Sequence, residues 1–228
     1  MNNSIAGAYT PARRIAVIPM RGLRNGKSRL RGAFPDTWIN GLVWVFAQIA
    51  LEAVLQADDH AAVVFVSPDP ELLRISADAY PRIIALQQPD DGLNEGLSFA
   101  FHVARQTCGS SAFYTFNADI PLISATAVRK LYHETEWRNN PCAVIAHDHF
   151  ETGVNALGLY KASEFQFHFG LNSHTLHKQE ARERNLQSIS VNDEALSHDI
   201  DTIEDVIWMQ THHEQFWRNL QRRITPFS

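Results

Sequence analysis

The sequence predicts an α/β fold of three layers, a Rossmann-like and mostly parallel sheet with helices on both faces. Short apolar runs alternate with longer stretches of helical periodicity along the chain, which is the pattern of βαβ units. Proline or aspartate follows several of these runs, where strands of such sheets give way to loops. The clearest run is Ala112–Phe116, whose five uncharged residues suit a strand buried on both faces.

The first half of the chain supplies three further strands and three helices. Residues 15–19 form a strand that Pro19 ends, and residues 61–67 form another that Pro68 closes. Residues 82–86 predict a third strand. The predicted helices are residues 38–55, 71–79 and 94–106, and the last of these carries apolar side chains at Leu97, Ala100, Phe101 and Ala104.

The second half continues the alternation with less regularity. Ser124 is a candidate N-cap for the helix that follows residues 112–116. Residues 142–146 and 155–160 predict strands, and residues 165–173 predict a loop with Ser173 as N-cap of a helix over 174–185. Thr202 and Asp205 form a capping-box-like start for the last helix. The helix N-termini near Ser173 and Thr202 are candidate phosphate cradles, because free backbone N–H groups point outward there.

Length and composition indicate one ordinary globular domain. The chain has 228 residues, of which 45% are hydrophobic and 20% charged, so it is long enough for one sizeable core. Its 25 acidic and 20 basic residues give a net charge of -5, and this argues against a nucleic-acid binder. We expect a loose N-terminal tail over residues 1–12, unlike a signal peptide, and a single domain over residues 13–228.

Two segments bear on the cellular compartment. Cys108 and Cys142 are too few for a disulfide framework and lack metal-ligand spacing, which indicates a reducing cytoplasm. Residues 38–55 are the most apolar segment, but Asn40, Gln48 and Glu52 interrupt them, whereas a membrane span needs roughly 18 nearly uninterrupted apolar residues. We therefore expect a buried helix and no membrane span; its exposed remainder could serve a homodimer interface.

Three aspartates are the first candidate site. Asp119 comes where the strand 112–116 ends, and Pro121 fixes the turn, so its carboxylate is placed to meet a metal or a phosphate. Asp199 and Asp201 would point the same way in an extended segment. Magnesium commonly takes one or two carboxylates plus substrate phosphates, which this set could supply. The alternative is that Asp119 only organises a turn and that Asp199 and Asp201 favour a helix start.

A basic loop after the first strand is the second candidate. Gly26-Lys27-Ser28 invites a P-loop interpretation, but that motif needs a glycine at the position of Arg21, and Gly22 is one residue too close. The loop still carries cations that could wrap a polyphosphate. They are Arg21, Arg24, Lys27 and Arg29. A solvated basic loop is the alternative.

Other chemistries find little support. The histidines lack the helical spacing of a zinc motif such as His-Glu-x-x-His, and the chain has no Gly-x-Ser-x-Gly nucleophile signature. The histidine pairs are His147 and His149, His174 and His177, and His212 and His213.

Taken together, these stretches resemble the 2-phospho-L-lactate guanylyltransferase family, CofC or FbiD, of the nucleotidyltransferases with a glycosyltransferase-A-type sheet. The resemblance covers about residues 13 to 208. It is carried by residues 17–30, Gly92-Leu-Asn94, Ala118-Asp-Ile-Pro-Leu122, residues 152–156, Phe169-Gly-x-x-Ser173 and residues 199–205. The family joins GTP to 2-phospho-L-lactate, phosphoenolpyruvate or 3-phospho-D-glycerate with release of pyrophosphate, on the route to coenzyme F-420.

The resemblance implies roles for individual residues. Asp119, Asp199 and Asp201 would hold Mg2+, and Asp119, Lys27 and Arg21 would be catalytic. The nucleotide would lie near Lys27 and the segment Gly92, Leu93 and Asn94. The acceptor acid would lie among Arg21, Thr152, Gly153, Val154, Gly170 and Ser173. A downstream transferase of the deazaflavin pathway is an implied partner.

Four positions depart from the family pattern. The family usually has Lys at Arg21, Ala at Gly26, and Gly-Thr-Gly-Thr where this chain has Glu151-Thr-Gly-Val154. A planar guanidinium in place of a compact ammonium and a lost hydroxyl both alter the pocket expected for the acid. Alternatives are a sugar-phosphate or molybdopterin nucleotidyltransferase of the same fold, or a non-catalytic nucleotide-binding protein.

Overall fold

The computed structural model describes residues 14–23, 26–89, 92–108, 111–137 and 139–224. The predicted tail over residues 1–12, the domain start at residue 13 and Arg24 of the basic loop lie outside these ranges.

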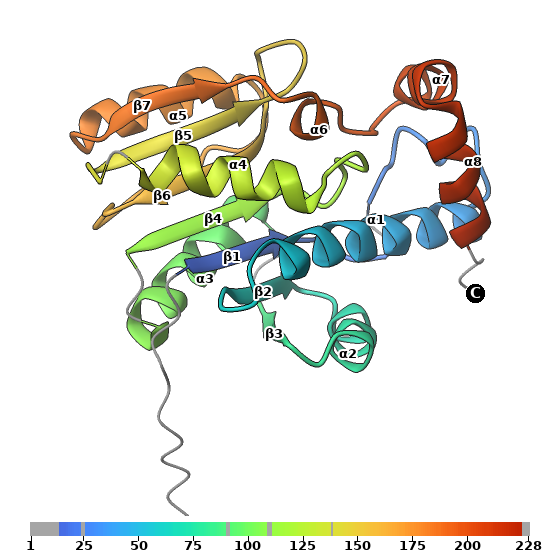
Figure 1. The fold of residues 1–228 in the computed structure, drawn as a ribbon. Coiled ribbons are helices and arrows are strands. Elements are labelled where there is room, and N and C mark those ends of the chain that lie inside the picture. The colour runs from blue at the N-terminus through green and yellow to red at the C-terminus, as the bar shows by residue number, and fades with distance from the viewer. Residues whose placement is uncertain (1–13, 24–25, 90–91, 109–110, 138, 225–228) are drawn as a thin grey trace, which may run out of the picture.

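A seven-stranded sheet with strand order β3-β2-β1-β4-β6-β5-β7 forms the middle layer. The paired strands are parallel except at β6, which is antiparallel to both β4 and β5. Figure 1 shows the arrowheads of β1, β4 and β7 on the side that faces α6 and α7. The predicted mostly parallel sheet is thus confirmed. The strands are β1 (Arg14–Pro19), β2 (Ala62–Ser67), β3 (Ile83–Gln87), β4 (Ala112–Phe116), β5 (Cys142–His147), β6 (Val154–Tyr160) and β7 (Gln187–Val191).

Helices cover both faces of the sheet, with α1 and α4 in front and α3 and α5 behind in the view of Figure 1. The helices α6 and α7 lie beyond the carboxyl ends of the strands, and the C-terminal helix α8 packs against α1. The helices are α1 (Asp36–Ala57), α2 (Pro70–Ala79), α3 (Leu93–Cys108), α4 (Ala125–Glu136), α5 (Ser173–Glu183), α6 (Glu194–Ser197), α7 (Ile203–His212) and α8 (Glu214–Arg223).

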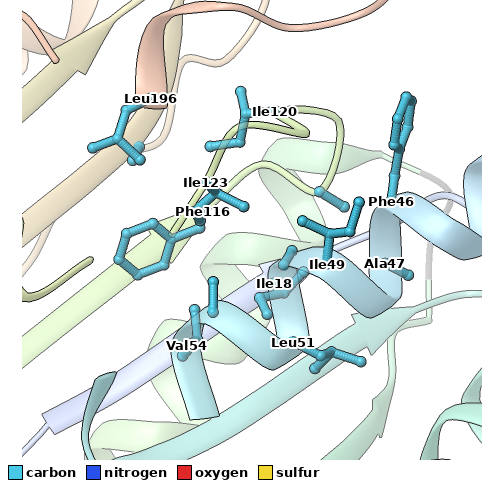
Figure 2. Close-up of a cluster of buried hydrophobic side chains, with 14 of the residues drawn as sticks. Ile18, Phe46, Ala47, Ile49, Leu51, Val54, Phe116, Ile120, Ile123 and Leu196 are labelled. Carbon is cyan, nitrogen blue, oxygen red and sulfur yellow. The ribbon is translucent and has the colours of Figure 1, made fainter. Parts of the chain in front are cut away.

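Each face of the sheet has its own apolar core. Side chains from β1, α1, β4, α6 and the loop after β4 meet on the front face (Figure 2). On the back face, Phe101 of α3 packs with Phe113 and Phe167, at ring-centroid distances of 4.9 and 5.9 Å. Because Ala118 and Ile120 both belong to the front core, the loop that carries Asp119 is anchored by apolar burial on both sides of that residue.

The helix α1 is a core helix. The helix is long enough for a membrane span, and its 18-residue apolar window has a mean hydropathy of 1.6. However, 67% of this window is buried inside the molecule. The helix packs against β1, β2, α4 and α8. This burial supports the expectation of a buried helix for residues 38–55.

Some predicted elements differ from the structure. The strand β7 and the helix α6 are absent from the prediction, because Gln187–Val191 has only two apolar side chains and the four residues of Glu194–Ser197 are too few to show a helical period. Ser173 is not the N-cap of α5 but its first residue. Asn172 takes the cap position with a left-handed φ of 57° and no side-chain cap. The last predicted helix is two helices, which break at His213.

An ion cluster closes the amino edge of the sheet, where β1 begins. The Arg14 guanidinium donates to both carboxylate oxygens of Glu136, at 2.6 and 2.8 Å, and to Asp58 at 2.6 Å. The Tyr114 hydroxyl also donates to Glu136, at 2.7 Å. We call these four residues the Arg14 cluster. It fastens the ends of α1 and α4 to β1 and β4.

Candidate active site

The fold brings the three predicted aspartates to one edge of the sheet. Asp119 follows β4 at its carboxyl end, and its backbone carbonyl accepts a hydrogen bond of 3.0 Å from the backbone N–H of Ile200. This bond ties the segment that carries Asp199 and Asp201 to the loop after β4. Ile200 is fully buried, so the two flanking carboxylates leave the core on the side of Asp119.

Lys27 binds two of these aspartates directly. Its ammonium donates to Asp119 Oδ2 at 2.7 Å and to Asp201 Oδ1 at 2.5 Å, and only 8% of the lysine side chain is exposed. Burial alone would lower the pKa of Lys27, but the two carboxylates outweigh it and raise that pKa well above its usual value. We call Lys27, Asp119, Asp199 and Asp201 the Lys27 cluster.

The third aspartate has no cation of its own in this arrangement. Asp199 accepts a long hydrogen bond of 3.4 Å from the side-chain amide of Asn155, at the start of β6. Burial, with repulsion from Asp119 and Asp201, raises the pKa of Asp199 to about 7. Burial would also raise the pKa of Asp201, but Lys27 outweighs this effect and, with a contribution from Arg29 and Arg21, holds that pKa below its usual range.

The cluster has more acceptors than donors. Asp119 Oδ1 and Asn117 Oδ1 are buried and lack a hydrogen-bond partner among the described residues. Carboxylate and amide oxygens are the donor atoms that Mg2+ prefers, so the chemistry of the set fits that ion. As the side chains stand, no three His, Cys, Asp or Glu residues of the described ranges are spaced to hold a metal. The ammonium of Lys27 takes the position between Asp119 and Asp201.

Two residues that the sequence analysis passed over shape the loop of Lys27. Arg31 donates to the backbone carbonyls of Leu23 and Gly26 at 3.1 and 3.0 Å. Asp69, after β2, accepts from the N–H of Leu23 at 3.3 Å. Gly22 lies against Asp69 with a φ of 130°, and a Cβ there would come within 2.9 Å of the carboxylate, so the position requires glycine.

The predicted nucleotide segment opens α3. The Gly92 carbonyl accepts from the side chain of Gln88 at 3.0 Å, and Leu93 packs on the back core. The side-chain amide of Asn94 makes two hydrogen bonds with the backbone of Phe169. Its oxygen accepts from the Phe169 N–H at 2.7 Å, and its nitrogen donates to the Phe169 carbonyl at 3.1 Å. Asn94 therefore joins the predicted nucleotide segment to the predicted acceptor loop.

The turn between β5 and β6 holds the first part of the predicted acceptor pocket. The Asp148 carboxylate accepts from the backbone N–H groups of Thr152 and Gly153, both at 2.9 Å. Glu151 has a left-handed φ of 59°, where the resembled family usually has glycine. Val154 begins β6, and its carbonyl accepts from Asn117 at 3.1 Å, so this segment joins β4 beside Asp119.

The remaining acceptor candidates lie at the start of α5. Gly170 has a φ of 122° and its carbonyl accepts from the backbone N–H of Ser173 at 3.2 Å. Ser173 is buried, and its carbonyl is hydrogen-bonded by His177 Nδ1 at 2.8 Å. Burial lowers the pKa of His177 to about 4, so the ring is neutral at pH 7. Arg21 is exposed and acts on Asp201 through its charge.

A separate hollow of about 700 Å³ lies between α4 and β7, and Lys130, Asp193 and Leu196 are among its lining residues. It contains none of the predicted site residues.

A family model matches this chain over residues 14–225, and its description is Guanylyl transferase CofC like. The chain belongs to this CofC-like guanylyl transferase family. The expected membership is therefore confirmed, and the match runs from β1 past α8.

Relatives of this CofC-like chain carry specific names. It is 34% identical over 198 residues to a phosphoenolpyruvate guanylyltransferase of Sphaerobacter thermophilus, covering 87% of this chain and 93% of the relative. It is 27% identical over 194 residues to a 3-phospho-D-glycerate guanylyltransferase of Phenylobacterium zucineum, covering 84% and 87% of the two chains.

Solved structures confirm the fold. A putative nucleotide-diphospho-sugar transferase from Desulfovibrio desulfuricans superposes with a TM-score of 0.73 at 18% identity, covering 93% of this chain and 98% of the other. A nucleotidyl transferase from Methanothermobacter thermautotroptrophicus gives a TM-score of 0.63 at 15% identity, covering 91% and 99%. The CofC-like chain therefore has the fold of the nucleotidyltransferases.

Proposed function

We propose that this chain joins GTP to a small phosphorylated acid and releases pyrophosphate, as a cytoplasmic step toward coenzyme F-420. Family membership and the names of its relatives support guanylyl transfer, with phosphoenolpyruvate or 3-phospho-D-glycerate as the first candidates for the acid and 2-phospho-L-lactate as the third. The observation that carries the proposal is the convergence of Asp119, Asp199 and Asp201 around Lys27.

The reaction needs no general base. The acceptor phosphate has a second pKa near 6, so at neutral pH it carries about -1.5 to -2 charges and can attack as it stands. Its oxygen forms the bond to the α-phosphorus of GTP, and the bond from that phosphorus to the leaving pyrophosphate breaks. No seryl or cysteinyl nucleophile is required, which agrees with the lack of such a signature in the sequence.

The main obstacle is repulsion between two anions that must meet in line. Catalysis then consists of positioning and charge neutralisation. Lys27, Arg21 and Arg29 carry positive charge at the edge where the aspartates meet. Asp119, Asp199 and Asp201 would hold Mg2+, which supplies further neutralisation of the phosphates when bound.

Two neighbouring segments would receive the substrates. Gly92, Leu93 and Asn94 would border the nucleotide, and the hydrogen bonds of Asn94 to Phe169 would keep that border in register with the acceptor loop. The acid would lie among the residues that the family resemblance implies, with the left-handed turn at Glu151 shaping one wall. Those residues are Arg21, Thr152, Gly153, Val154, Gly170 and Ser173. Action as one domain, a homodimer and a downstream transferase partner stay predictions.

Mass spectrometry of reaction mixtures tests the proposal. GTP and Mg2+ are incubated with each of the three acids, and ATP replaces GTP in a parallel series. We expect a guanosine diphospho-acid and pyrophosphate with at least one acid, and loss of both products in Asp119→Asn. The control is Asp78→Asn, which removes an exposed carboxylate on α2 and should keep full activity. A thermal shift with GTP but no product from any acid would contradict the proposal and favour a binding protein.

A further inference from the structure

Lys27 takes the position that the proposed function gives to a divalent cation. Its ammonium lies within hydrogen-bond distance of Asp119 Oδ2 and Asp201 Oδ1, two of the three proposed metal ligands. An ammonium and a divalent cation repel each other strongly at such short range. Both cannot share these two oxygens.

The charge balance shows that the lysine neutralises the cluster only in part. Three carboxylates face one ammonium, Asp199 has a long bond of 3.4 Å to Asn155 and no direct bond to Lys27, and Asp119 Oδ1 has no partner among the described residues. With the lysine in place, no three His, Cys, Asp or Glu side chains in the described ranges are spaced to enclose a metal. The cluster is therefore closed to a cation but retains oxygens that suit one.

The backbone around Lys27 is fixed while its side chain is long. Arg31 holds the carbonyl of Gly26, and the carbonyl of Lys27 accepts from the N–H of Leu30 at 2.9 Å. Lys27 has a left-handed φ of 58°, a conformation that a non-glycine residue keeps only where its surroundings enforce it. Movement of the ammonium therefore needs only rotations of the four-carbon side chain.

We infer that Lys27 is an internal counter-ion, which fills the cation position in the nucleotide-free protein and leaves it when a triphosphate arrives. The phosphates offer the ammonium new anionic partners, so its departure opens Asp119 and Asp201 at the moment when a metal-nucleotide complex is present. Free metal alone meets a closed site. The inference rests on the proposed function, because it takes these aspartates as the metal ligands.

Binding of Mn2+ alone to nucleotide-free protein tests the inference, with free Mn2+ measured by electron paramagnetic resonance. We expect weak binding by the wild type and at least tenfold tighter binding by Lys27→Gln, which removes the charge, keeps a polar end group and shortens the side chain by one atom. The double variant Lys27→Gln/Asp119→Asn should lose the gain. Equal or weaker binding by Lys27→Gln would overturn the inference.

Two matched variants separate the placement of Lys27 from general charge. Lys27→Arg keeps a cation and should bind Mn2+ within threefold of the wild type. Arg29→Gln removes an exposed neighbouring charge that acts on Asp201 without a direct bond, and it should also stay within threefold. A tenfold gain in Arg29→Gln would overturn the inference in favour of simple electrostatics.

Wild-type measurements cover the case in which Lys27→Gln does not fold. Micromolar Mn2+ binding by the nucleotide-free wild type, lost in Asp119→Asn, would overturn the inference. Turnover of GTP is measured in parallel. If the wild type turns over GTP and also binds Mn2+ at micromolar concentration without nucleotide, only the counter-ion role of Lys27 is removed. Where Lys27→Gln does fold, its failure to bind Mn2+ together with the absence of wild-type turnover with every acid would remove the metal role of the aspartates as well.

Discussion

The two edges of the sheet each hold a basic residue among carboxylates, and the two clusters differ in how completely they are paired. In the Arg14 cluster, a planar guanidinium makes a two-bond contact with Glu136 and a third bond with Asp58, and Tyr114 adds a donor. In the Lys27 cluster, one ammonium is shared by two of three carboxylates.

The difference separates a structural ion cluster from one prepared for ligands. The Arg14 cluster satisfies its oxygens with protein donors, as stable buried pairs require. The Lys27 cluster leaves Asp119 Oδ1 without a partner among the described residues and raises the pKa of Asp199. A protein retains such incomplete pairing where a substrate or ion completes it.

The largest expected effect is on stability at the Arg14 cluster. Arg14→Met would leave Glu136 and Asp58 without their cation, and we expect the free energy of unfolding to fall by about 3 kcal/mol. Urea denaturation measures it. Activity per folded molecule should be unchanged, and Arg14→Lys should lose less than half as much. If the stability of Arg14→Met were unchanged, the Arg14 cluster would not be a structural ion cluster and would not differ from the Lys27 cluster in that respect.

A smaller change in the free energy of unfolding, this time a gain, is expected on mutation of Asp199. Its pKa is about 7 in the folded protein against 3.8 for the free side chain, so the folded state binds more protons between about pH 4 and 7. The free energy of unfolding should therefore fall as the pH rises through that window. Asp199→Asn should remove this loss and stabilise the metal-free protein at pH 8 by about 2 kcal/mol, while turnover is lost.

Thermal unfolding from pH 4 to 8 compares Asp199→Asn with wild type, and Asp78→Asn serves as the exposed control. A stability difference that stays constant with pH would show that Asp199 is ionised like an ordinary aspartate.

A loss of stability of about 1 kcal/mol is expected on mutation of Asp69, which contacts the loop of Lys27 at Leu23. Its Oδ1 caps α2 by accepting from Glu71 and Leu72, and its Oδ2 accepts from Leu23. Asp69→Ala should lose about 1 kcal/mol of stability because the cap of α2 is removed. It should also raise KM for GTP because the contact to Leu23 in the loop of Lys27 is removed.

Asp69→Ser separates the two roles, since serine can cap α2 but is too short to reach Leu23. We expect stability to return while KM stays raised. If Asp69→Ser restored both the stability and the KM for GTP, the contact of Asp69 to Leu23 would not contribute to GTP binding.

The smallest effect is expected for an exposed pair. Arg74 and Asp78 lie one turn apart on α2 at 3.0 Å, and both are about two-thirds exposed. Arg74→Gln should change the free energy of unfolding by less than about 0.5 kcal/mol, because water screens such pairs. The same urea titration measures it, and a loss comparable to that of Arg14→Met would refute the link between burial and the weight of an ion pair.

Much of the fold follows from local pattern. The strand Ala112–Phe116 and the caps at Ser124 and Thr202 are confirmed, since burial on both faces and short-range capping leave direct signatures in sequence. The edge strand β7 was missed because its five residues include only two apolar side chains, too few to distinguish it from a loop. The N-cap of α5 was wrong because Asn172 adopts a left-handed conformation that serine at the next position does not signal.

The sequence predicts that Asp119 and Asp201 share a site, but it does not predict which residue pairs with them. Asp119 and Asp201 were expected to bind a cation, and the structure places them together, with the ammonium of Lys27 between them. Contacts across 92 and 174 residues of sequence have no local signal, so that ion pair could not be derived from the chain alone. Arg31 and Asp69 were missed for the same reason.

The reversed strand β6 has a consequence for how substrate preference can change. Since β5 and β6 form a hairpin, the turn at residues 148–153 leaves and re-enters the sheet at the same edge, and both of its ends are held by strand pairing. Mutations, insertions or deletions confined to that turn can therefore remodel the wall proposed to face the acid without moving β4 or Asp119. Evolution could exchange one acceptor for another in this turn while the phosphate chemistry stays intact.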